Sequence, residues 1–156
     1  MKFKHISVLP EKVLDFAPEK TQTILDCTIG GGGHSRNLLE KFPNAKLFGI
    51  DRDKNALKAA KYFLKQFEKN INLTQANFSE LKDCFIHWMN PSFDYILADI
   101  GTSSEQLDKP ERGFSFNHDG PLDMRMDPDR QQITAAYLVN NSSKNELIEI
   151  LQNFGE

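Results

Sequence analysis

Apolar and polar residues along the first two-thirds of the chain form two kinds of pattern that follow each other in turn. Short apolar runs, typical of buried strands, cover residues 23–29, 46–51, 71–76 and 93–100. Apolar residues at helical spacing predict helices over residues 8–16, 36–42, 54–67 and 79–89. After the first helix the order is β-α-β-α-β-α-β, which predicts an α/β fold with a parallel sheet and helices on both faces.

The regular alternation then stops. Residues 101–129 show no strand or helix period, and a structureless stretch of this length in a compact domain is usually functional or disordered. The large apolar residues in the stretch argue against disorder: Leu107, Phe114, Phe116, Leu122, Met124 and Met126. Helices are predicted again over residues 134–139 and 144–154. Ser143 and Glu146 form a capping-box pattern at the start of the second of these helices.

The composition is that of a globular domain, because 39% of the 156 residues are hydrophobic and 26% are charged. No apolar run approaches the roughly 20 residues that span a bilayer, and no apolar stretch follows the N-terminus. We therefore expect no membrane contact, no signal peptide and a cytoplasmic location. Cys27 and Cys84 are expected to be free thiols, and the histidines and cysteines have no metal-ligand spacing.

The charge is distributed unevenly. The net charge of −3 argues against a strongly basic nucleic-acid binder, but residues 40–70 carry eight Lys or Arg against four Asp or Glu. Lysines 54, 58, 61 and 65 fall on one stripe of the helix predicted there. Two interpretations are open, namely a solvated helix face and a surface that attracts phosphate.

Four consecutive glycines, residues 30–33, separate the first strand from the next helix. Glycines let the backbone turn sharply and approach a ligand closely, and a helix start offers free N–H groups. The pattern D-x-T-x-G-G-G-G-H-S differs from the dinucleotide pattern G-x-G-x-x-G. Asp26, at the end of the strand, suits a cationic amino-acid group, such as that of S-adenosylmethionine, better than a phosphate.

Two more carboxylates lie at strand ends. Asp51 ends the second strand, where a carboxylate accepts hydrogen bonds from ribose hydroxyls, and Asp99 ends the fourth strand beside the same crevice. Each has a plainer interpretation, because Asp51 can cap the helix that begins at Lys54 and Asp99 can cap the following loop. The joint occurrence of acidic residues at strands one, two and four favours a nucleoside site.

Six segments carry a more specific pattern: residues 5–14, DCTIGGGGHS at 26–35, IDRD at 50–53, DIGTSSEQLD at 99–108, ERGFSF at 111–116 and GPLDMRMD at 120–127. These segments closely resemble the bacterial 16S ribosomal RNA (cytosine-N4) methyltransferases, the RsmH or MraW family. The resemblance covers essentially the whole chain, and the stretch from Asp99 to Asp127 is its most specific part. Thr102, Glu105 and Ala98 depart from the family pattern without removing a functional group.

The resemblance implies a Rossmann-like class I S-adenosylmethionine-dependent methyltransferase. The core would span residues 1–128, and residues 129–156 would begin an inserted helical substrate domain. The implied reaction is methylation of the exocyclic N4 of a decoding-centre cytidine (C1402) of 16S rRNA in the small ribosomal subunit. Family members are longer and complete their sheet with later strands, so we expect a fragment with an incomplete sheet. The oligomeric state stays open, with a homodimer as one alternative.

The resemblance carries over a set of cofactor residues: Gly32, Gly33, His34, Asp51, Phe78, Asp99 and Gln106. Catalysis would need alignment, an unstacked base and an acceptor for the proton that leaves N4. Asp99 is the first candidate for that acceptor, and Asp123 and Asp127 are alternatives. Ile100-Gly101-Thr102 replaces the prolines of the D/N-P-P-Y/F motif of many amino-methyltransferases, so cofactor binding alone is the other role open to Asp99.

Four side chains are candidate RNA contacts: Arg112, Phe114, Phe116 and Arg125. The two phenylalanines can stack on a flipped base, worth about 1–3 kcal/mol per base, or form a small core that holds the loop. The two arginines can hold phosphates or form structural salt bridges with Asp108 or Asp123.

Two other functions are weighed against the methyltransferase. One is a nicotinamide-binding oxidoreductase domain, which the glycine register and the lack of a Tyr-x-x-x-Lys pair argue against. The other is an inactive cofactor-binding fragment.

Overall fold

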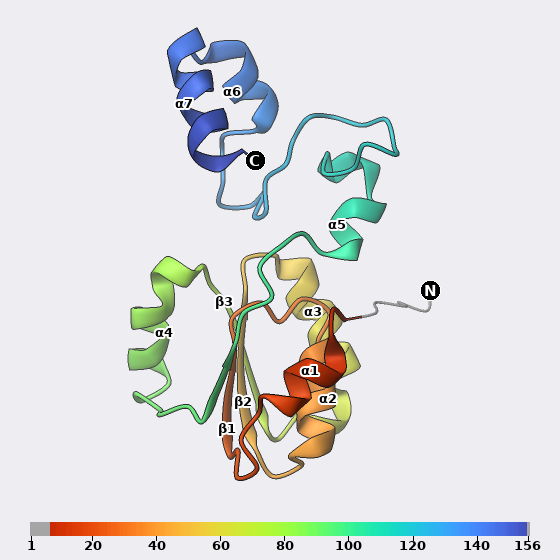
Figure 1. Cartoon of the computed structure of the whole chain (residues 1–156), viewed down its shortest axis with the longest axis vertical. Helices are drawn as coiled ribbons and strands as arrows, with labels where there is room; N and C mark the ends of the chain where they lie inside the picture. Colours follow the sequence, from red (N-terminus) through yellow and green to blue (C-terminus); the bar gives the residue numbers. More distant parts are fainter. Residues whose placement is uncertain (1–6, 156) are drawn as a thin grey trace. The chain divides into compact units, whose positions relative to one another are not determined.

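The computed structural model describes residues 7–155 and divides the chain into two compact units, Met1–Gly101 and Thr102–Glu156. The first unit contains the sheet, and the second is helical (Figure 1). The predicted boundary at residue 128, between a methyltransferase core and an inserted domain, stays a prediction.

The first unit is built on a four-stranded parallel sheet in the order β3-β2-β1-β4. Its strands are β1 (Thr23–Asp26), β2 (Lys46–Asp51), β3 (Ile71–Gln75) and β4 (Tyr95–Leu97). All four lie within the predicted apolar runs, so the predicted parallel sheet is confirmed. β4 is shorter than its run, and beyond its end the backbone N–H of Asp99 donates to the Thr28 hydroxyl.

Each helix predicted in the first unit is present, although the one predicted over residues 36–42 begins at Gly33 and the one predicted over residues 79–89 begins at Phe78. The helices of this unit are α1 (Pro10–Asp15), α2 (Gly33–Lys41), α3 (Lys54–Phe63), η1 (Lys65–Phe67), η2 (Phe78–Glu80) and α4 (Leu81–His87). The predicted helix over residues 54–67 is broken after Phe63 into α3 and the short η1. The Asp53 side chain caps α3 by accepting a hydrogen bond from the Asn55 N–H.

Helices cover both faces of the sheet, as predicted: α1, α2 and α3 lie on one side and α4 on the other (Figure 1). Neighbouring residues of a strand point to opposite faces, so Ile24 joins the core under α2 and α3 while Leu25 joins the core under α4. Trp88 is buried in the second core, and its indole N–H donates to Thr74 Oγ1.

The second unit contains more helix than predicted. Its elements are α5 (Ser104–Asp108), η3 (Pro110–Arg112), α6 (Ala135–Asn141) and α7 (Lys144–Phe154). The expectation of a structureless stretch over residues 101–129 is therefore wrong for α5 and η3, which are too short to show a helical period. The predicted bounds of α7 are confirmed, and so is the capping box, with Ser143 N–H donating to Glu146 Oε2 at 2.6 Å.

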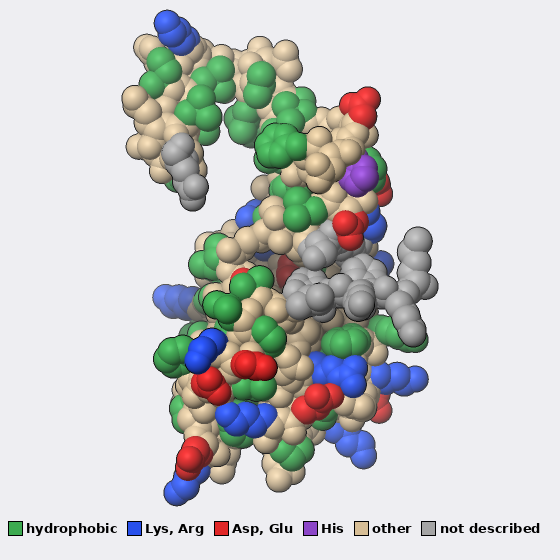
Figure 2. All heavy atoms as spheres, turned by 45° about the vertical axis from the view of Figure 1, so that its right-hand side comes forward, with side chains coloured by type: hydrophobic (Ala, Val, Ile, Leu, Met, Phe, Trp, Pro, Cys, Tyr) green, Lys and Arg blue, Asp and Glu red, His purple; other side chains and the backbone are tan. Residues whose placement is uncertain are grey.

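Apolar side chains of α6 and α7 reach the surface, as the hydrophobic spheres on this helical pair show (Figure 2). Among the described residues of the two helices none is buried, and Val139, Leu151 and Phe154 are exposed. Across the part of the chain that the structure describes, no helix is long and apolar enough to cross a bilayer.

Candidate cofactor site at the carboxyl ends of the strands

The candidate site lies where the parallel strands end. Asp26 is the last residue of β1 and pairs with Gly49 of β2 and Leu97 of β4, so the ends of these strands share one edge of the sheet. β1 lies between β2 and β4, which makes its end the point where the strand order reverses. Ligands of open α/β sheets bind at such a switch point.

The glycine loop combines a tight turn with an open backbone. Gly30 and Gly32 have φ values of 51° and 87°, a left-handed conformation that favours glycine. A Cβ added at Gly32 would lie 3.2 Å from Leu64 Cγ, whereas one added at Gly31 would meet nothing within 4 Å. The loop is therefore packed against the core at Gly32 and has free space beside its backbone at Gly31.

Asp26 is tied into the fold through both of its carboxylate oxygens. Its side chain is 1% exposed and accepts hydrogen bonds from Ser35 Oγ at 2.6 Å and Thr28 N–H at 3.0 Å. Burial raises the pKa of this carboxyl above its usual value. The carboxylate is enclosed and links residues on either side of the glycine loop, and its predicted meeting with a cationic ligand group stays a prediction.

Asp51 ties the end of β2 to the glycine loop. One carboxylate oxygen accepts the Gly30 N–H at 2.9 Å and the other accepts the Asp53 N–H at 2.8 Å. The helix cap of α3 is Asp53, so the plainer interpretation of Asp51 as that cap is wrong. Burial raises the pKa of the half-buried Asp51 carboxyl. An ionised carboxylate has about four acceptor positions, so capacity for ligand hydroxyls remains.

Asp99 is held by two residues that follow β1. Its backbone N–H donates to Thr28 Oγ1 at 2.7 Å, and its Oδ2 lies 3.5 Å from Nε2 of His34. Sequence reasoning missed the role of Thr28, although the D-x-T pattern before the glycines contains it. The His34 side chain is 9% exposed and that of Asp99 is 41% exposed, so the pair has one enclosed and one accessible member.

His34 has one ring nitrogen without a hydrogen-bond partner among the described residues. This nitrogen, Nδ1, is buried. A neutral imidazole whose Nε2–H faces Asp99 presents Nδ1 as an acceptor, and a buried acceptor without a partner costs about 1–3 kcal/mol. This atom is therefore suited to a hydrogen-bond donor brought by a ligand.

Phe78 lies near the same edge. It opens η2, directly after β3, and its ring is partly exposed. β3 pairs with β2 so that Gln75 is the register partner of Asp51. The structure thus brings Gly32, Gly33, His34, Asp51, Phe78 and Asp99 to one edge of the sheet in the first unit.

Gln106 and Arg112 are buried in the second unit. Gln106 completes a capping box at the start of α5, accepting the Ser103 N–H at 2.9 Å, and it also donates to the sulfur of Met126. Arg112 donates to the backbone carbonyls of Arg125 and Met126. Both side chains hold the backbone of this unit, and their ligand roles stay predictions.

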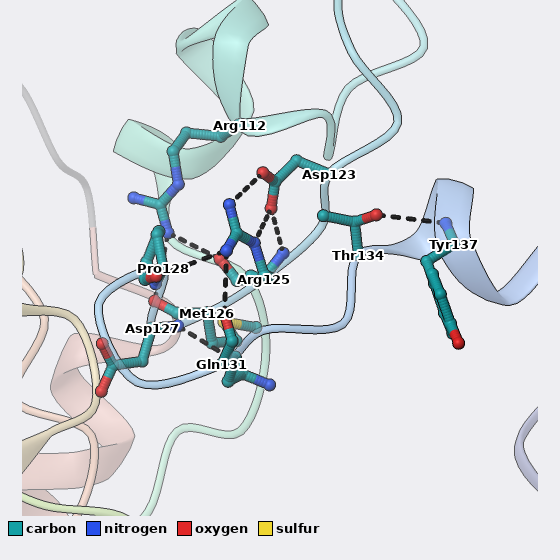
Figure 3. Close-up of polar contacts among 9 residues, drawn as sticks. All are labelled: Arg112, Asp123, Arg125, Met126, Asp127, Pro128, Gln131, Thr134 and Tyr137. Carbon is teal, nitrogen blue, oxygen red and sulfur yellow. Dashed lines mark hydrogen bonds and ion pairs between the residues drawn. The ribbon is translucent and has the colours of Figure 1, made fainter.

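Arg125 forms a two-pronged ion pair with Asp123 (Figure 3). Its Nε and Nη2 donate to the two carboxylate oxygens at 2.8 and 2.7 Å, and its Nη1 donates to the Gln131 carbonyl. Of the two interpretations of Arg125, the structural salt bridge is present. Hydrogen bonding from Arg125 lowers the pKa of Asp123, which makes Asp123 a weaker proton acceptor.

Phe114 and Phe116 differ in environment. Phe116 is fully exposed, so it contributes to no core of this loop, and that interpretation is wrong for it. Phe114 is half-buried, and the guanidinium carbon of Arg112 lies 5.9 Å from the centre of its ring. Base stacking by either ring stays a prediction.

Cys27 and Cys84 are free and buried. Burial raises the pKa of both thiols, so neither is an activated nucleophile. Among the described residues no group of three or more His, Cys, Asp or Glu side chains could hold a metal ion.

Comparison with known proteins agrees with the resemblance in the sequence, since residues 2–156 match the MraW methylase family. The chain belongs to the MraW methylase family. The chain is 46% identical over 157 residues to "Ribosomal RNA small subunit methyltransferase H" of Cyanothece sp., covering 99% of this chain and 51% of that protein. The protein of the same name from Desulfosudis oleivorans is 42% identical, over 100% of this chain and 50% of its own length.

A solved structure of NSun6 from Pyrococcus horikoshii with SFG is 25% identical and gives a TM-score of 0.46, covering 59% of this chain and 23% of that chain. The sheet order and the MraW family confirm the predicted Rossmann-like methyltransferase fold. The chain spans about half the length of the curated relatives that it matches.

Proposed function

We propose that this chain binds S-adenosylmethionine at the glycine loop and serves in methylation of small-subunit ribosomal RNA. One observation carries the proposal, namely that the carboxyl ends of the strands hold two carboxylates next to the glycine loop. Asp51 is hydrogen-bonded to Gly30 and Asp99 lies beside His34, in a member of the MraW family. The names of the relatives, "Ribosomal RNA small subunit methyltransferase H", support the substrate class. The finer reaction that we propose is transfer to N4 of the decoding-centre cytidine C1402 of 16S rRNA, in the cytoplasm.

The residues at the strand ends fit this cofactor. Gly31 has open space beside its backbone, Asp51 keeps free acceptor positions, and His34 Nδ1 is buried without a hydrogen-bond partner among the described residues. Ribose hydroxyls suit Asp51, and the partly exposed ring of Phe78 suits the adenine. Gly32, Gly33, His34 and Asp99 complete the proposed set in the first unit, and Gln106 belongs to it through the family pattern.

When bound, S-adenosylmethionine supplies an activated methyl group. The residues of this chain then have two tasks. They hold the reacting groups in line, and they take up the proton that the cytosine amino group loses when N4 becomes bonded to the methyl carbon. We assign the proton to the Asp99 carboxylate, which is partly exposed and later returns the proton to water. Asp123 is the weaker candidate, since both its oxygens are bonded to Arg125.

On the RNA side we propose unequal roles for four residues. The exposed ring of Phe116 is available to stack on an unpaired base. Phe114, Arg112 and Arg125 shape the loop around it through the contacts described above. The partner is 16S rRNA within the small ribosomal subunit.

Calorimetry with S-adenosylmethionine and with NAD tests the proposal. We expect binding of S-adenosylmethionine, weakened in Asp51→Ala by about 1.5–3 kcal/mol, the value of a hydrogen bond to a charged group. Asp53→Ala is the matched control, because it removes the neighbouring carboxylate that caps α3. Binding of NAD alone contradicts the proposal, and an unchanged dissociation constant in Asp51→Ala removes Asp51 from the site.

Methyl transfer is tested with labelled S-adenosylmethionine, small-subunit particles and nucleoside analysis of the RNA. Because the chain spans half the length of its relatives, we expect weak or no turnover from these 156 residues. Any product should be N4-methylcytidine. Full methylation by this chain contradicts the first expectation, and a methyl group on another atom contradicts the second.

A further inference from the structure

A row of lysines runs along α3 and η1. It consists of Lys54, Lys58, Lys61 and Lys65, which we call the α3 basic stripe, and all four are exposed. Residues 54–67 contain no Asp or Glu. The stripe is therefore a segment of one sign of charge in a chain whose net charge is −3.

The α3 basic stripe faces away from the core. Ala56, Ala60 and Leu64, on another side of the same segment, are buried, and the last two belong to the core on this side of the sheet. The four lysines are separated by steps of four, three and four residues, which keep them on one side of a helix. Tyr62, beside the stripe, is 84% exposed and adds an aromatic ring to this surface.

An ordinary solvated helix face does not explain this pattern. Such faces usually alternate Glu and Lys at four-residue spacing, which stabilises the helix by about 0.2–0.5 kcal/mol per pair, whereas like charges at that spacing destabilise it by similar amounts. Within residues 7–155, none of the four lysines forms an ion pair with the chain itself. The α3 basic stripe thus carries a repulsion that an external anion would relieve.

The α3 basic stripe begins three residues after Asp51 of the candidate site. α3 starts just after Asp51, whose carboxylate is bonded to Gly30 of the glycine loop. The stripe begins at Lys54, beside the edge of the sheet where the cofactor residues meet, and extends from there along α3.

We propose that the α3 basic stripe binds the phosphate backbone of the RNA substrate, a role that rests on the proposed function. Protein interfaces are depleted in lysine at their centres, whereas contacts to nucleic-acid phosphates depend on Lys and Arg. An exposed aromatic ring beside a basic track is also typical of surfaces that bind single strands. RNA is therefore the partner favoured over an acidic protein.

The test measures binding of a fluorescein-labelled 16S rRNA fragment spanning the decoding centre to the 156-residue chain by anisotropy, across a range of salt concentrations. In the fourfold variant K54Q/K58Q/K61Q/K65Q we expect about a tenfold or greater loss of affinity near 100 mM salt. The slope of log affinity against log salt should become shallower by about 0.7–0.9 for each phosphate that the variant no longer neutralises. The fourfold Lys→Arg variant should bind like the wild type.

A second fourfold variant, K20Q/K46Q/K82Q/K144Q, removes the same charge from other exposed positions and should retain most of the affinity. Equal loss in this control, or no loss in the stripe variant, overturns the proposal, as does failure of the wild-type chain to bind the RNA. Competition by polyglutamate as strong as that by RNA points to an acidic protein and also overturns it. Calorimetry with S-adenosylmethionine separates the two hypotheses, because the stripe variant should keep cofactor affinity.

Discussion

Nε2 of His34 lies 3.5 Å from Oδ2 of Asp99, which connects the first turn of α2 to the segment after β4. The Asp99 backbone is held from the same side, through the hydroxyl of Thr28. The loop that we propose for the methyl donor therefore also positions the carboxylate that we propose for the proton. Different substitutions of His34 should therefore separate its effect on binding of the methyl donor from its effect on the position of Asp99.

Replacing His34 by Gln or by Asn tests this double role. The Gln side chain can place an amide at the position of Nε2 and keep the contact with Asp99, whereas Asn can replace only Nδ1, the atom that we propose for the ligand. We expect His34→Gln to weaken S-adenosylmethionine binding more than His34→Asn does. The contact with Asp99 should show the opposite order. In double-mutant cycles with Asp99→Asn, measured by urea unfolding, we expect a coupling free energy of about 0.5 kcal/mol or more for His34→Asn, which loses the contact. We expect almost none for His34→Gln, which keeps it. Equal effects of the two variants on both readouts would refute the division of roles.

Gly32→Ala should destabilise the first unit. The left-handed φ of 87° at Gly32 costs a residue with a Cβ about 1–2 kcal/mol, and the new atom would lie 3.2 Å from Leu64 Cγ. Gly31→Ala is the control, since its Cβ meets nothing within 4 Å, and a gain of about 0.4–1 kcal/mol is expected there. Denaturant unfolding measures both. A Gly31→Ala variant that is destabilised as much as Gly32→Ala would contradict this account of the loop.

The buried carboxyl of Asp26 should make stability depend on pH. Burial raises its pKa above 3.8 in the folded chain, so the folded state holds the proton more tightly than the unfolded state. The stabilisation by this group is fully present below pH 3.8 and is lost as pH rises through the folded-state pKa. Asp26→Asn lacks this titration, and we expect it to gain stability relative to the wild type as pH rises over that range. Urea unfolding at a series of pH values checks this, and a difference independent of pH would disprove it.

Arg125→Gln should loosen the segment from Asp123 to Gln131. The change removes the two-pronged contact with Asp123 and the hydrogen bond to the Gln131 carbonyl, so amide exchange in this segment should become faster. Arg130→Gln is the comparison, because that arginine is more exposed and lies 3.8 Å from the Asp127 carboxylate. Hydrogen–deuterium exchange measures the effect. Weaker RNA binding in Arg125→Gln with unchanged exchange would instead favour a phosphate contact.

The fold was largely predictable because its signals are local. Apolar runs place all four strands within the predicted ranges, and residues 144–154 form α7 as predicted. Helical spacing finds the helices of the first unit, although α2 begins three residues before its predicted range. α5 was missed because a helix of five residues has no period to detect. Its signal was still present, since Ser103 and Gln106 have the spacing of a capping box.

The candidate site was predictable only in outline. The glycines and the carboxylates at strand ends are visible in the chain, but the availability of each carboxylate depends on partners distant in sequence. Asp51 accepts a hydrogen bond from Gly30, 21 residues earlier, and Asp99 is held by Thr28, 71 residues earlier. No local pattern distinguishes the enclosed Asp26 from the accessible Asp99.

The sequence by itself determined the family, the alternating order of strands and helices, and the loop that four glycines permit. These follow from side-chain periodicity, backbone sterics and shared motifs, which act over a few residues. Only the tertiary structure decided that Asp26 is buried, that Asp123 is neutralised by Arg125 and that Asp99 stays accessible beside His34. The reason is that burial and hydrogen bonding set the charge and reach of a carboxylate, and folding alone decides which groups surround it.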